Sequence, residues 1–215
     1  KDQNIIYDTN IDLVNRLITA CNKSKSEKHI IFSSSTQVKN SNAYAESKSH
    51  GYDLLKEWSN SSGNNLTNLI IPNIFGPFGK PFYNSFIATF CYQLVQNETP
   101  IINEDNNIKL IYVGNLVKLI YKILRQNKKL SNSNSQINDI KVDYDNNEYV
   151  SKILKMLKQY DKQYKKNYTF PSLNTKFELN LFNTYRSFLP SNYFPKKYKE
   201  NIDDRGSFVE LIRSN

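Results

Sequence analysis

The sequence predicts an α/β protein built on part of a Rossmann-like parallel sheet, followed by a small, mostly helical part. Short apolar segments rich in β-branched residues alternate with longer segments whose apolar residues recur at helical spacing. Parallel strands are buried on both faces, and the alternating helices supply that cover. With 215 residues, 39% of them hydrophobic, the chain is long enough to bury a core.

The first third of the chain follows this alternation. Residues 8–21 predict a helix that starts behind a cap at Thr9 or Asn10, and residues 29–32 predict a buried strand. A second helix is expected from about Ala43, and Gly63 is placed to end it in the left-handed conformation. A second buried strand is expected in the segment 66–76, which ends in a Pro-Gly loop.

The rest of the chain is predicted in the same way. Helices are expected over residues 84–98, 115–126, 146–164 and 175–190, and short strands near 100–103, 108–112 and 140–144. We divide the chain into a partial Rossmann-type catalytic part (1–126), a helical substrate-binding part (127–199) and the start of a further strand (200–215).

Charge and cysteine content exclude several classes of function. The net charge of +9 comes mainly from Lys, and the few Arg residues offer little for bidentate contacts to bases, so we expect no nucleic-acid partner. No apolar run approaches a membrane span, and no signal peptide is apparent, so we expect no membrane association and a cytoplasmic location. Cys21 and Cys91 are expected to be buried, reduced thiols, and no metal site is expected.

A serine, a tyrosine and a lysine form the first candidate site. Tyr44 and Lys48 are one helical turn apart and share a face, where an ammonium favours the phenolate form of a neighbouring tyrosine. Such a tyrosine can exchange a proton with a carbonyl oxygen, and Ser35, at the end of the preceding strand, could hydrogen-bond that oxygen. A chain with 15 Tyr and this much Lys yields such pairs by chance, as at Tyr52/Lys56 and Tyr193/Lys197. Only Tyr44 follows a buried strand that ends in serines, at the edge where open α/β sheets bind ligands.

Four further residues are candidates for substrate binding. Asn73 lies just past the second buried strand, and Asn84 or Ser85 caps a helix whose first N–H groups could hold a phosphate, with Lys80 nearby. Taken alone, each is better explained as a turn or an ordinary helix cap.

Taken in order, these segments resemble the extended short-chain dehydrogenase/reductase superfamily. The resemblance rests on the serines before "YAESK", on "PNIFGP", and on "IKLIYVGNLV", in which Gly114 and Asn115 stand where the family carries two acids. The short loop at 36–43, "GKPFYNSFIATFCYQL" and "DDRGSFVELI" are similar to one branch, in which an NADPH-dependent capsule-sugar reductase is fused to a cupin domain.

The resemblance implies reduction of a 4-keto UDP-N-acetyl-6-deoxyhexose with NADP or NAD as cofactor. Tyr44 would be the proton donor, Lys48 its tuner and cofactor-ribose contact, and Ser35 the carbonyl ligand. Tyr44, Lys48 and Pro72 would face the cofactor. The residues expected on the side of the UDP-sugar substrate are Asn73, Lys80, Asn84 and Ser85. A homodimer is left open.

The glycine-rich turn that cradles the dinucleotide pyrophosphate in this superfamily is missing, since the six glycines form no Gly-x-x-Gly-x-x-Gly pattern. We expect the chain to start after the first half of the Rossmann sheet and to stop at the first strand of a cupin. A catalytically dead remnant that binds sugar nucleotides or acts as an assembly partner is therefore the alternative. An epimerase is less favoured, and a dehydratase is disfavoured because Thr36 and Gln37, which follow Ser35, are not acids. The tail, as a lone strand, is expected to be mobile or to pair with another sheet.

Overall fold

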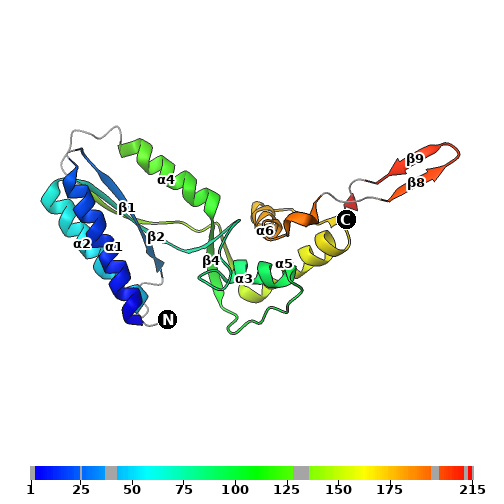
Figure 1. Cartoon of the computed structure of the whole chain (residues 1–215), viewed down its shortest axis with the longest axis horizontal. Helices are drawn as coiled ribbons and strands as arrows, with labels where there is room; N and C mark the ends of the chain where they lie inside the picture. The colour runs from blue at the N-terminus through cyan, green and yellow to red at the C-terminus, as the bar shows by residue number, and fades with distance from the viewer. Residues whose placement is uncertain are drawn as a thin grey trace. The chain divides into compact units, whose positions relative to one another are not determined.

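The computed structural model describes residues 3–24, 26–36, 43–127, 136–194, 199–210 and 213–214 (Figure 1). These residues form two compact units of interleaved sequence. The first unit comprises residues 1–72 and 119–143, and the second comprises residues 73–118 and 144–215. Each unit is described by itself.

The first unit is built on a parallel sheet. Its strands lie in the order β1-β2-β5, and both pairings are parallel, so the predicted α/β class is confirmed. The elements are α1 (Gln3–Lys23), β1 (His29–Ser35), α2 (Ala43–Ser62), β2 (Asn65–Ile71), the latter part of α4 (Val113–Asn127) and β5 (Ile137–Lys141). The middle strand, β2, is mostly buried, whereas β1 is half-buried along most of its length.

Helices α1 and α2 lie side by side (Figure 1), and a glycine lies where they meet. A Cβ at Gly51 of α2 would come within 3.2 Å of Val14 in α1 and 3.9 Å of Phe32 in β1. At the far end of the helix pair, the indole N–H of Trp58 donates to the side chain of Asn22 at 2.9 Å. Gly63 then ends α2 with φ of 71°, as predicted.

The predicted start of the first helix is wrong. Helix α1 begins at Gln3, so Thr9 and Asn10 lie inside it and cap nothing. Asn10 instead donates from its side chain to the hydroxyl of Ser47 in α2 at 2.8 Å. A polar residue that signals a helix start in the sequence serves here as a contact between two helices.

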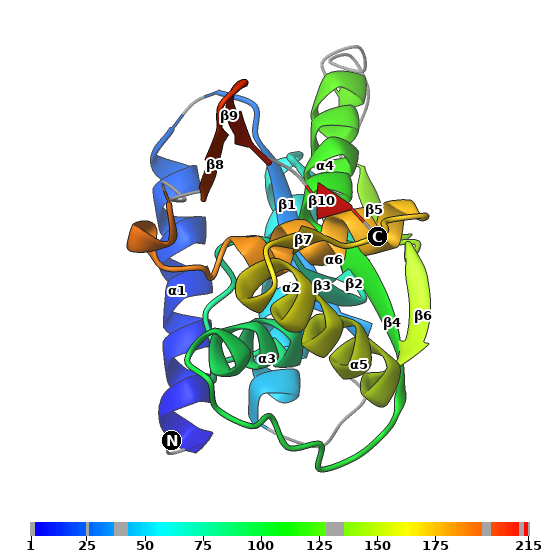
Figure 2. The ribbon, with the colours of Figure 1, turned by 90° about the vertical axis from the view of Figure 1, so that its right-hand side faces the viewer.

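The second unit combines a small mixed sheet with several helices. Strands β3 and β4 are parallel, and β6 runs antiparallel along the other side of β4 (Figure 2). The elements are β3 (Asn73–Phe75), α3 (Phe86–Val95), β4 (Asn107–Tyr112), the start of α4, β6 (Asn146–Tyr149), α5 (Val150–Tyr160), the π-helix η2 (Asp161–Lys166), β7 (Thr169–Phe170), α6 (Lys176–Arg186) and the 3-10 helix η3 (Ser191–Tyr193).

Two predictions fail in this unit. Residues 100–103 form no strand, and the polar segment 146–149, predicted as the start of a helix, pairs with β4 as strand β6. The pairing partner decides the conformation there, because the segment has little apolar pattern of its own.

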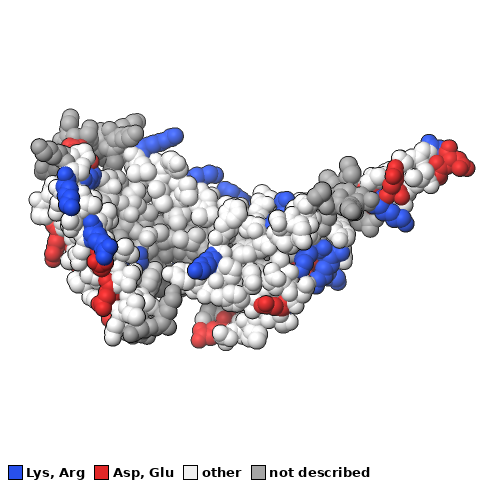
Figure 3. Space-filling view, in the orientation of Figure 1, with Lys and Arg blue, Asp and Glu red and all other residues white. Residues whose placement is uncertain are grey.

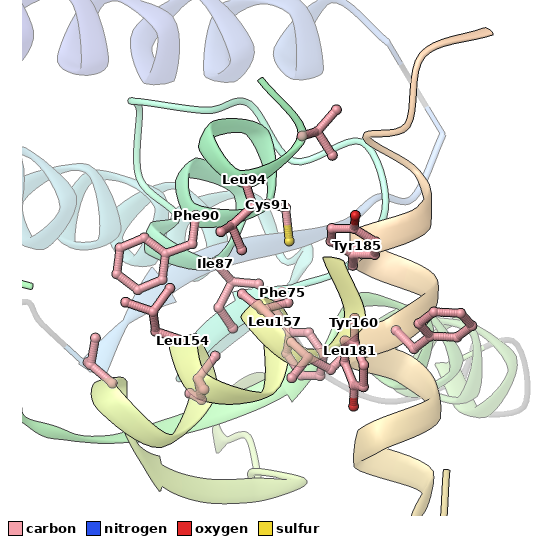
Figure 4. Close-up of a cluster of buried hydrophobic side chains, with 14 of the residues drawn as sticks. Phe75, Ile87, Phe90, Cys91, Leu94, Leu154, Leu157, Tyr160, Leu181 and Tyr185 are labelled. Atoms are coloured by element: carbon pink, nitrogen blue, oxygen red, sulfur yellow. The ribbon is translucent and has the colours of Figure 1, made fainter. Parts of the chain in front are cut away.

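The core of the second unit lies between α3, α5, α6 and the first strand of its sheet (Figure 4). Phe75, Ile87, Leu157, Leu181 and Tyr185 are all at most 2% exposed. The core also holds Cys91, and burial raises the pKa of that thiol. Both cysteines are free, as expected. However, Cys21 is only half-buried.

The tail forms a hairpin instead of a lone strand. Strands β8 (Glu200–Asp203) and β9 (Gly206–Val209) pair antiparallel through a turn in which Gly206 has φ of 143°. Every residue of the two strands is exposed. Strand β10 (Arg213–Ser214) pairs in parallel with β7.

In the part of the chain that the structure describes, no helix is long and apolar enough to cross a membrane. Figure 3 shows Lys and Arg in separate groups over the face in view, with acidic side chains between some of them.

Candidate active site

The candidate catalytic residues belong to the first unit. Ser35 is the last residue of β1, at the carboxyl end of a parallel strand, and its Cα pairs in register with Ile71 at the end of β2. Helix α2 begins at Ala43, so Tyr44 lies in its first turn, and Lys48 follows one turn later. The connecting residues 37–42 lie outside the described ranges.

Lys48 joins α2 to the end of β1. Its ammonium donates to the backbone carbonyl oxygen of Ser33 at 3.2 Å and lies 5.0 Å from the ring centroid of Phe32. The same ammonium is 5.9 Å from the ring centroid of Tyr44, whose side chain is 40% exposed. Burial lowers the pKa of Lys48 from its ordinary value.

This arrangement has a chemical consequence. A positive charge lies beside a tyrosine that faces solvent instead of the core, at the carboxyl edge of parallel strands. An ammonium at that position can stabilise the negative charge that a tyrosine carries after it gives up a proton, as the predicted role of Tyr44 requires. Tyr52, which also has a lysine four residues later, differs because it stacks on Phe32 inside the unit and its hydroxyl is buried.

The candidate on the cofactor side and the first substrate candidate are neighbours in sequence. Pro72 directly follows β2 and is buried. Asn73 follows and opens β3, where it pairs in register with Leu110 and where its amide lies 3.5 Å from the carbonyl oxygen of Lys109. It therefore lies just past a buried strand, as predicted, but within a strand and not in a loop.

The other substrate candidates share the segment before α3 in the second unit. Ser85 is the N-cap of α3, and its hydroxyl accepts from the N–H of Ala88 at 3.3 Å. Asn84 is exposed, and the Lys80 ammonium lies 5.6 Å from the ring centroid of Tyr83. The predicted cap is thus Ser85 and not Asn84.

The polar groups of the "YVGN" segment, residues 112–115, find hydrogen-bond partners nearby. The side chain of Asn115 donates to a carboxylate oxygen of Asp145 at 2.9 Å, and the backbone N–H of Tyr112 donates to the same oxygen at 2.7 Å. A Cβ at Gly114 would meet the Tyr112 ring at 2.8 Å, so the glycine fits the close approach of that ring.

Sequence reasoning missed two contacts around these residues. The Phe32 ring and the Ser33 carbonyl position Lys48, and their only sequence signal is their place at the end of the strand that carries Ser35. It also missed two exposed phenylalanines with positive φ, Phe78 and Phe82, next to Lys80. An aromatic residue on each side of "GKP" was the available signal.

Open α/β sheets bind their ligands at the carboxyl edge of the strands, which is where the Tyr44 and Lys48 pair lies. Residues 1–138 match the model of the NAD dependent epimerase/dehydratase family, and the chain belongs to that family.

Individual relatives agree with this assignment. The chain is 28% identical over 186 residues to the UDP-2-acetamido-2,6-beta-L-arabino-hexul-4-ose reductase of Pseudomonas aeruginosa, covering 86% of this chain and 48% of the relative. It resembles the crystal structure of the capsular polysaccharide assembling protein CapF from Staphylococcus aureus with a TM-score of 0.75 and 32% identity, over 93% of this chain and 54% of that one. UDP-glucose 4-epimerase from Thermotoga maritima shares the fold, with a TM-score of 0.62 at 18% identity over 85% of this chain and 70% of that one. The chain thus spans about half the length of the first two proteins.

Proposed function

We propose that this chain carries the proton-transfer and sugar-nucleotide part of a reductase that acts on a 4-keto UDP-N-acetyl-6-deoxyhexose in surface-polysaccharide or glycan biosynthesis. The observation that carries the proposal is the position of Lys48, which is fixed to the Ser33 carbonyl and lies beside the exposed Tyr44. The similarity to a protein named as a UDP-hexulose 4-reductase supports the choice of substrate class.

In the proposed reaction the Tyr44 hydroxyl donates its proton to the ketone oxygen as that oxygen becomes a hydroxyl. Lys48 stabilises the phenolate that remains on Tyr44. Ser35 donates a hydrogen bond to the same ketone oxygen and holds it within reach of Tyr44. Asn73, Lys80, Asn84 and Ser85 are proposed to bind the sugar nucleotide, with Lys80 offering positive charge to its diphosphate.

The residues present fit one end of a nicotinamide cofactor and not the other. The Lys48 ammonium, which contacts the end of β1, is suited to donate a hydrogen bond to a ribose hydroxyl of the cofactor. Tyr44 and Pro72 are proposed to face the cofactor as well. The sequence holds no glycine-rich turn for the pyrophosphate. When bound, NADPH or NADH would supply the hydride that reduces the ketone carbon. We accordingly expect this chain alone to bind NADPH weakly or not at all in a fluorescence titration, and micromolar binding would contradict that expectation.

A chimera tests the catalytic assignment. In it, this chain replaces the matching 186 residues of the Pseudomonas aeruginosa relative. Turnover is followed by the loss of reduced nicotinamide absorbance, and UDP-sugar affinity by calorimetry. Tyr44→Phe should lower turnover about 10²- to 10⁴-fold and leave UDP-sugar affinity unchanged, because only proton transfer is lost. Tyr52→Phe, on the same helix and with its own lysine four residues on, is the matched control and should keep full turnover. Equal losses in the two variants would refute the role of Tyr44.

Gly114 and Asn115, which stand where the family carries two acids, favour a second candidate function, a non-catalytic sugar-nucleotide binder. A chimera that binds the UDP-sugar but reduces nothing, with or without Tyr44, would support this alternative over the reductase.

A further inference from the structure

The segment between β3 and α3 holds two phenylalanines in an unfavourable backbone conformation. Phe78 has φ of 65° and Phe82 has φ of 55°, in the left-handed region that residues with a Cβ avoid. Their side chains are 91% and 65% exposed, so burial of the rings offers little compensation. Such a conformation persists only where the surrounding structure enforces it, and it is found preferentially at functional sites.

One hydroxyl group enforces the conformation at Phe82. Thr89, in the first turn of α3, accepts the backbone N–H of Phe82 with its Oγ1 at 2.9 Å. The same Oγ1 donates to the backbone carbonyl of Ser85 at 3.0 Å. The second contact is common for a threonine in a helix, but the first is not, because it reaches outside the helix. Thr89 thereby ties both ends of the segment from Phe82 to Ser85.

The Phe82 ring is held as well. It meets the ring of Tyr92 edge-on, with centroids 5.6 Å apart and an interplanar angle of 79°. Tyr92 lies three residues after Thr89 and therefore on the same side of α3. Two side chains of α3, one polar and one aromatic, fix a single residue of the preceding segment.

The segment that Thr89 fixes, from Phe82 to Ser85, contains or closely follows three of the proposed substrate-binding residues. Asn84 and Ser85 lie within it, and Lys80 lies two residues before Phe82, with its ammonium over the Tyr83 ring. We infer that Thr89 is a positioning residue of the sugar-nucleotide site. It holds the segment from Phe82 to Ser85 in one conformation before the ligand binds, so that binding does not have to order Lys80 and Asn84. This inference rests on the proposed function.

The test uses the whole chain and UDP-N-acetylglucosamine as the probe, with affinity measured by calorimetry. Thr89→Val keeps the size of the side chain and removes both hydrogen bonds, and it should weaken probe binding about tenfold. Thr89→Ser keeps the hydroxyl and should bind as the wild type does. A purely structural role would lower the thermal stability of Thr89→Val and leave the affinity of the folded variant for the probe unchanged.

A second pair of variants addresses the strain directly. Asparagine tolerates positive φ better than phenylalanine. Phe82→Asn in the Thr89→Val background should therefore recover part of the lost affinity, and Phe82→Asn alone reports any direct contact of the ring with the probe. Amide hydrogen exchange at Phe82 should be fast in Thr89→Val and slow in Thr89→Ser.

The possible failures are distinguishable. A wild-type chain that does not bind the probe overturns the proposed sugar-nucleotide function, and the inference about Thr89 falls with it. A wild-type chain that binds, together with a folded Thr89→Val that binds equally well, overturns the inference alone. Unchanged protection of the Phe82 amide in Thr89→Val also overturns it, whatever the affinity.

Discussion

Lys165 holds the end of α3, and its replacement tests how firmly that helix is anchored. Its ammonium donates to the carbonyl oxygen of Val95 at 2.7 Å and to the side chain of Asn97 at 3.0 Å, and it lies 3.7 Å from the Asp161 carboxylate. The Lys165 side chain is 17% exposed and Asp161 only 5%, so water replaces these contacts poorly.

Lys165→Met removes the charge and keeps most of the apolar stem. Charge-assisted hydrogen bonds contribute about 1.5–3 kcal/mol each, and methionine recovers part of the loss by packing. The Asp161 carboxylate keeps two partners, Lys166 at 3.0 Å and the Tyr185 hydroxyl at 3.0 Å, so the full cost of a stranded charge is avoided. We therefore expect the free energy of unfolding of the second unit to fall by about 2–4 kcal/mol.

Urea denaturation followed by far-UV circular dichroism measures this change, and amide hydrogen exchange in α3 assigns it to the second unit. The matched control is Lys162→Met, in the same π-helix but exposed, which should change stability by less than about 0.5 kcal/mol. If the two variants unfold at the same urea concentration, the ammonium does not anchor α3 and the argument is wrong.

Two further predictions concern packing and pH. Gly51→Ala should leave the free energy of unfolding nearly unchanged, because the gain in helix propensity offsets a Cβ at 3.2 Å from Val14. Gly51→Val should lower that free energy by about 1–3 kcal/mol, because the larger side chain forces α1 and α2 apart. An equal effect of the two variants in thermal melts would contradict this. Burial raises the pKa of Tyr52 to about 12, and it also raises the pKa values of Tyr160 and Tyr185. The folded state thus retains protons that the unfolded chain loses near pH 10, so the stability that these tyrosines contribute is full below about pH 10 and is lost as the pH rises through their folded-state pKa values. Burial also raises the pKa of Cys91, so the urea midpoint should begin to fall above about pH 8.5, where the unfolded thiol loses its proton, and should fall more steeply above about pH 10. Tyr185→Phe should lessen the steeper part of that fall, and a midpoint that is unchanged well above about pH 10 would contradict the expectation.

Local signals in the sequence predicted those parts of the fold that local chemistry decides. The apolar spacing from Leu55 to Trp58 and the glycine at position 63 mark helix α2 and its end correctly. The pairing of residues 146–149 with β4 and the hairpin of residues 200–209 depend on partners remote from the pattern or on turn geometry, and both were missed.

In the candidate site, too, local spacing could be predicted and contacts to remote elements could not. Spacing alone placed Tyr44 and Lys48 on one face, but the carbonyl that Lys48 contacts belongs to another element. Thr89 gave no signal, because a threonine inside an apolar helix is ordinary in sequence and only its contact with Phe82 distinguishes it.

The π-helix η2 has a consequence for how this segment tolerates insertions and deletions. A π turn accommodates one residue more than an α turn, so a chain one residue shorter between Asp161 and Lys166 would close into a regular α-helix with its own hydrogen bonds intact. Because the wide turn absorbs the extra residue, the parts before and after it would keep their positions, whereas the residues inside the turn would change place. Lys165 would then leave the end of α3. The extra residue of η2 therefore positions Lys165 at the end of α3. Among relatives, a one-residue gap in this segment should coincide with the loss of the lysine.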